Sequence, residues 1–83
     1  MTRTIERTQT GVRMEKSLLK VLKALAEYCE LSLGDLLEGI VLHSFEGKAP
    51  FSGETRRVID NLKAVYGCEL TAGDSHRLEE KRQ

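Results

Sequence analysis

Polar residues alternate with β-branched or apolar residues near the start of the chain. Between residues 8 and 14, threonine, valine and methionine occupy one set of positions, and glutamine, glycine and arginine occupy the other. Successive side chains of a strand point to opposite faces, so this alternation predicts a short β-strand at about 8–14 with one polar face. The chain offers no second strand of similar quality. We therefore expect this strand to pair with the same strand of a second copy as an antiparallel ribbon.

Two longer segments have apolar residues at helical spacing. Residues 15–30 repeat leucine, valine and alanine every three or four positions, with lysines on the opposite side, which predicts an amphipathic helix. Ser32 and Asp35 match the weaker, aspartate form of a capping box, so a second helix should span about 33–46. Gly47 is a candidate C-terminal cap for it.

The rest of the chain predicts a third helix. Glycine and proline between residues 47 and 53 are typical of a linker. Ser52 is a candidate cap for a helix at about 53–66 that ends at Gly67. Beyond it, Thr71 and Asp74 favour one more helical turn before a polar tail, and disorder is the alternative for this last piece.

The order of strand, helix, short turn and helix over residues 1–47 resembles the ribbon-helix-helix family of DNA-binding proteins. The resemblance rests on QTGVRM at 9–14, LLKVL at 18–22 and ELSL at 30–33. It implies a mainly helical fold with one short strand, in which two chains intertwine as a homodimer around a two-stranded antiparallel ribbon. Residues 48–83 would be a C-terminal extension of that domain.

The resemblance implies that the outward face of the ribbon meets base edges in the major groove. The base-reading residues would then be Gln9, Gly11 and Arg13. Arginine can bind guanine, and glutamine can bind adenine, through two hydrogen bonds each. Gly11 departs from the family because it has no side chain to read a base. We favour a structural role for it, in which the missing Cβ lets two backbones approach near the two-fold axis.

The resemblance also implies a phosphate site at the start of the second helix. Backbone N–H groups of Ser32, Leu33 and Gly34, together with the positive end of the helix dipole, would bind the anion. Asp35 competes for the same donors and repels a phosphate. Simple capping of the helix by Ser32 and Asp35, with no bound anion, is therefore the alternative.

Charge is unevenly distributed, although the 83 residues carry a formal net charge of zero. Residues 1–23 contain six basic and two acidic residues, whereas residues 24–55 contain one basic and six acidic residues. Lysine and arginine supply most of the non-specific affinity for DNA phosphates. We therefore also assign phosphate contacts to Arg3 and Arg7, which lie on an arm beside the predicted ribbon.

One strand and two helices cannot bury all the apolar residues of positions 1–47 within a single chain. Folding and dimerisation should therefore be a single event. The predicted dimer core takes the following residues from both chains: Val12, Met14, Leu18, Leu22, Leu25, Leu36, Leu37, Ile40 and Val41.

Composition argues against a membrane protein, a metal-binding protein and an enzyme. No apolar run is long enough to cross a bilayer, and Cys29 and Cys68 resemble the reduced thiols of a cytoplasmic protein without a signal peptide. Neither His43 nor His76 has a cysteine or carboxylate at ligand spacing, so we expect no metal and no cofactor. No combination of nucleophile, base and orienting group indicates an enzyme.

These features predict a sequence-specific transcriptional regulator, either a repressor or an autoregulator. It would bind double-stranded DNA as a homodimer, with higher assembly on DNA left open. One alternative is an antitoxin whose segment from Phe51 onward binds a toxin. The other is a dimeric helical interaction module without DNA binding. The apolar stripe of the third helix favours packing on the dimer over toxin binding.

Overall fold

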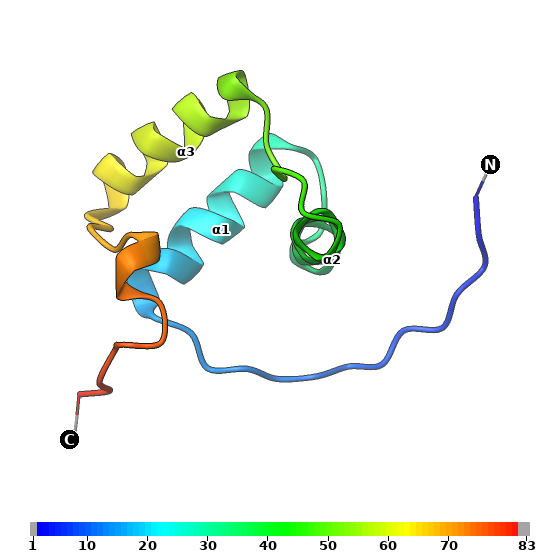
Figure 1. Ribbon diagram of the computed structural model, residues 1–83, viewed down its shortest axis with the longest axis horizontal. Helices are drawn as coiled ribbons and strands as arrows, with labels where there is room; N and C mark the ends of the chain where they lie inside the picture. Colours follow the sequence, from blue (N-terminus) through cyan, green and yellow to red (C-terminus); the bar gives the residue numbers. More distant parts are fainter. Residues whose placement is uncertain (1, 82–83) are drawn as a thin grey trace.

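The computed structural model describes residues 2–81, which form three α-helices and one short 3-10 turn. Helix α1 spans Lys16–Tyr28, α2 spans Leu33–Phe45 and α3 spans Gly53–Tyr66, and the 3-10 turn η1 spans Ala72–Asp74. Each α-helix begins and ends within two residues of the range that the sequence predicts. Figure 1 shows α1 and α3 side by side, with α2 viewed end-on next to α1.

The predicted strand at 8–14 is wrong. No residue from 2 to 81 lies in a β-strand. Residues 2–15, here called the arm, instead run as an extended segment away from the start of α1 (Figure 1). A strand requires backbone hydrogen bonds to a neighbouring strand, and no segment within 2–81 supplies them to the arm. The regular secondary structure of residues 2–81 is therefore all-helical. The predicted ribbon-helix-helix fold class, which requires a two-stranded ribbon, is wrong.

Serine caps fix the starts of α2 and α3. The Ser32 Oγ accepts a hydrogen bond from the Asp35 N–H at 3.1 Å, and the Ser52 Oγ accepts one from the Thr55 N–H at 3.2 Å. These are the caps that the sequence predicts. Helix α3 ends at Gly67, whose φ of 65° lies in the left-handed region that glycine tolerates best.

The core lies where the three helices meet. Its buried centre consists of Leu25 and Ala26 from α1 and Leu36 from α2. Helix α3 packs chiefly against α1 and covers this centre with Val58, Ile59 and Leu62. Helix α3 therefore belongs to the same hydrophobic core as α1 and α2. None of the helices within 2–81 is long and apolar enough to span a membrane.

Candidate nucleic-acid interface

The arm presents the predicted base-reading residues to solvent. Gln9, Gly11 and Arg13 are all exposed. A Cβ built on Gly11 would meet no atom within 4 Å. No described part of the chain therefore requires a glycine at this position, and the close approach predicted for the ribbon is absent from the described residues.

Arg7 ties the arm to α2. Its Nη2 donates to Oδ1 of Asp35 and to Oε1 of Glu38, both at 2.9 Å, and its Nε donates to Oε2 of Glu38 at 3.1 Å. The hydrogen bond to Glu38, followed by the charges of Glu38 and Asp35, raises the pKa of the Arg7 guanidinium. The same hydrogen bond lowers the pKa of the Glu38 carboxyl group. A residue predicted to contact phosphate is thus held by two carboxylates of its own chain.

This contact lies beside the predicted phosphate site at the start of α2. The first N–H groups of a helix have no carbonyl partner within the helix, and here Leu33 and Gly34 occupy the first two positions. The Asp35 N–H is satisfied by Ser32, and the Asp35 carboxylate receives the Arg7 guanidinium. The negative charge that would repel a phosphate at this helix end is therefore paired with a positive one.

Arg13 contacts the C-terminal end of the described chain. Its Nη2 forms an ion pair with Oε2 of Glu80. Residues 13–16 and 78–81 line one shared cleft of about 510 Å³. The Arg13 side chain nevertheless remains 84% exposed. Its guanidinium is therefore still accessible to a ligand in solvent.

Glu15 joins the arm to α1, a role that the sequence analysis missed. Its carboxylate accepts hydrogen bonds from the Leu18 N–H at 2.9 Å and from the Ser17 N–H at 3.1 Å. The Ser17 hydroxyl donates to the same carboxylate at 2.6 Å. These hydrogen bonds, with that of the Ser17 side chain the largest, lower the pKa of Glu15. The available signal was a carboxylate placed directly before an apolar helical repeat.

The residues predicted for a dimer core fall into two groups within one chain. The first group is already packed: Leu25 and Leu36 are buried, Leu22 and Ile40 pack against them, and Met14 and Leu37 are half-buried. The second group faces solvent, with exposed fractions of 73% for Val12, 43% for Val41 and 36% for Leu18. This second group is the more accessible to a second molecule.

An apolar groove runs along α2 where the arm passes it. Ile5, Leu37, Val41 and Leu42 line the groove, which encloses about 450 Å³, and Glu38 lies with them. The sequence analysis placed Leu37 and Val41 in a core, but it did not single out Ile5 or Leu42. Ile5 lies outside the helical repeat, so only the path of the arm reveals its place on α2.

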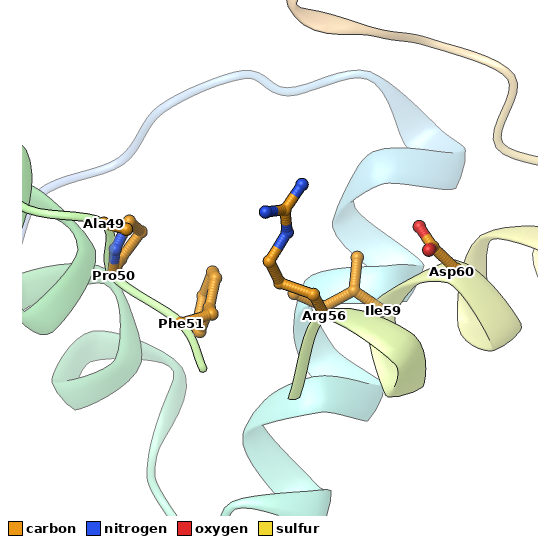
Figure 2. Close-up of a pocket in the computed structure, with 6 residues that line it drawn as sticks. All are labelled: Ala49, Pro50, Phe51, Arg56, Ile59 and Asp60. Atoms are coloured by element: carbon orange, nitrogen blue, oxygen red, sulfur yellow. The ribbon is translucent and has the colours of Figure 1, made fainter. Parts of the chain in front are cut away.

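A second cavity lies between the linker and α3 (Figure 2). It encloses about 290 Å³ and is lined by Ala49, Pro50, Phe51, Arg56, Ile59 and Asp60. Figure 2 shows that the charged ends of Arg56 and Asp60 do not converge. Because a ligand site needs converging polar groups, we assign this cavity no role.

Residues 2–81 contain no group of three or more histidine, cysteine or acidic side chains that could hold a metal ion. No protein-family model, curated protein or solved structure matches the chain.

Proposed function

We propose that the protein binds double-stranded DNA through its arm and regulates transcription as a sequence-specific repressor or autoregulator. The observation that carries this proposal is the extended, exposed arm with Gln9 and Arg13 on it. Extended arms that carry arginine enter DNA grooves, where arginine and glutamine side chains can bind base edges. Gln9 and Arg13 would supply the choice of sequence.

Phosphate contacts would fix the position of the arm on the duplex. Arg3 is exposed on the arm, and Arg7 pairs with Asp35 in the first turn of α2. Arg7 offsets part of the negative charge of Asp35 and Glu38 at this helix end, which reduces their repulsion of an anion.

The proposal includes a homodimer. Apolar side chains on or beside α2 remain exposed in one chain: Ile5 by 56%, Leu42 by 61% and Phe45 by 82%. A second copy that covers this face would remove apolar surface from water. It would also present two arms to two halves of a symmetric DNA site. We place the protein in the cytoplasm, where the free thiols of Cys29 and Cys68 would stay reduced.

A DNA titration with two variants tests the proposal. Fluorescence anisotropy would follow binding to the DNA upstream of the protein's own coding sequence and to a random duplex, at low and physiological salt, with the mass of the protein measured in parallel. Arg13→Ala should weaken binding to the preferred site by about 1–3 kcal/mol and reduce the preference over random DNA.

Arg56→Ala is the matched control, because it removes an exposed arginine from α3 rather than from the arm. It should retain the preference for the upstream site. Equal losses in the two variants would contradict base reading by Arg13. Absence of DNA binding at low salt would reject the function and favour a helical interaction module.

A further inference from the structure

The C-terminal tail, residues 75–81, brings an acidic side chain to the arginine that we propose as a base reader. Glu80 pairs with Arg13 across 67 positions of sequence. A carboxylate offers a guanidinium two neighbouring acceptors, as the O6 and N7 atoms of guanine do. In the free protein, Glu80 therefore occupies donors that Arg13 would use on DNA.

The path of the tail is set by ordered contacts upstream of it. The Lys63 Nζ donates to the Leu70 carbonyl at 2.7 Å, which attaches the segment before η1 to α3. The Thr71 N–H then donates to Oδ2 of Asp74 at 2.9 Å, and the Arg77 N–H donates to the Asp74 carbonyl at 3.0 Å. Figure 1 shows the chain leaving α3, passing through η1 and continuing into the tail.

The charges on the two sides of the shared cleft are complementary. The arm side carries Arg13 and Lys16 with Glu15 between them, and the tail side carries Glu79 and Glu80 followed by Lys81, so the net charges are +1 and −1. Opposite charges attract across such a cleft, and dissolved salt weakens the attraction. Among the described residues, the ion pair of Arg13 with Glu80 is the specific charge contact across this cleft.

We propose that the tail is an intramolecular competitor of DNA, in which Glu80 occupies Arg13 until DNA displaces it. This inference rests on the proposed function. The Arg13 and Glu80 side chains are 84% and 67% exposed, and exposed ion pairs are weak. The tail should therefore lower the affinity for DNA without preventing binding, and it should leave Arg13 when DNA binds.

Two glutamine variants test the competition in anisotropy titrations at low salt. Glu80→Gln should tighten DNA binding by roughly two- to fivefold. Glu79→Gln removes the same charge one position earlier, and Glu79 forms no ion pair with any described residue. It should give a smaller gain. In an Arg13→Ala background, Glu80→Gln should give no more than the small gain of Glu79→Gln, and high salt should reduce its effect in the unmodified chain.

Backbone NMR relaxation of residues 78–81 provides a measurement that does not depend on DNA binding. Arg13→Ala should increase the mobility of these residues, and addition of DNA to the unmodified protein should do the same. Equal gains from Glu79→Gln and Glu80→Gln, or a tail that stays ordered on DNA, would overturn the competition and leave the proposed function standing. Failure of the wild type and of Glu80→Gln to bind DNA would overturn both.

Discussion

The helical body and the arm are held in place by different forces. Leu25 in α1 is 2% exposed and Leu36 in α2 is 4% exposed, so the body is stabilised by apolar burial at about 25 cal/mol per Å². The arm is tied to the body by ion pairs of largely exposed side chains, of which Arg7 is 60% exposed. Ion pairs between such exposed side chains are weak because water screens them. We infer that the arm can detach while the body stays folded.

The largest expected effect comes from an apolar truncation in the body. Leu25→Ala leaves a cavity between α1 and α2 and should reduce the free energy of unfolding by about 2–5 kcal/mol. Val12→Ala, an apolar truncation in the exposed arm, should reduce it by less than about 0.5 kcal/mol at low protein concentration. Denaturant titrations followed by circular dichroism would measure both values.

The effect of Val12→Ala on stability should depend on protein concentration. If Val12 contributes to a dimer interface, the cost of Val12→Ala should grow as the concentration rises, because dimerisation is coupled to stability. Equal losses in the free energy of unfolding for Leu25→Ala and Val12→Ala at low concentration would contradict the distinction between body and arm.

A helix cap should have an intermediate effect within the body. Ser52→Ala removes the acceptor for the Thr55 N–H at the start of α3 and should cost about 1 kcal/mol of stability. Ser44→Ala is the control, since Ser44 is an exposed residue inside α2, where alanine is a slightly better helix former. Thermal unfolding would rank the two variants. A Ser44→Ala loss as large as that of Ser52→Ala would contradict the role of the cap.

The smallest effects concern the carboxylates that anchor the arm. The pKa values of Glu15 and Glu38 are lowered from the ordinary value of 4.5, so the folded chain binds fewer protons than the unfolded chain in this acidic range. The stability that these groups contribute is therefore present above pH 4.5 and is lost as the pH falls through the lowered pKa values.

Two variants separate the anchors in NMR titrations of the glutamate carboxyl groups. Ser17→Ala removes the largest cause of the Glu15 shift and should move the pKa of Glu15 back toward its ordinary value, with that of Glu38 unchanged. Arg7→Ala should move the pKa of Glu38 and leave that of Glu15 unchanged. A response of both glutamates to either variant would show that the two anchors are coupled.

The helices were predictable because each one is encoded locally. A serine cap such as Ser52, an apolar repeat and a stop such as Gly67 follow one another within a single short segment of about four helical turns, and the structure contains each of them. The strand was not predictable in the same way. Alternation in the arm determines which side chains share a face, but a strand also needs a backbone partner that the described chain lacks.

The candidate site was predicted in parts but not as an assembly. The sequence identified Arg7 and Asp35 as oppositely charged groups, one expected to bind phosphate and the other to repel it. Their ion pair joins residues 28 positions apart, and the pair of Arg13 with Glu80 spans 67 positions. Local periodicity carries no information about such distances, so only the folded chain reveals that each arginine has a carboxylate partner.

The reactivity of the buried Cys68 thiol reports local opening of the fold. Cys68 follows α3 directly, is 5% exposed, and donates its backbone N–H to the Lys63 carbonyl at 2.8 Å. A thiol reagent can reach it only when the segment after α3 lifts from the body, so its labelling rate reports how often this corner opens while the rest stays folded. Cys29, half-buried at the end of α1, is the internal reference for the same reagent.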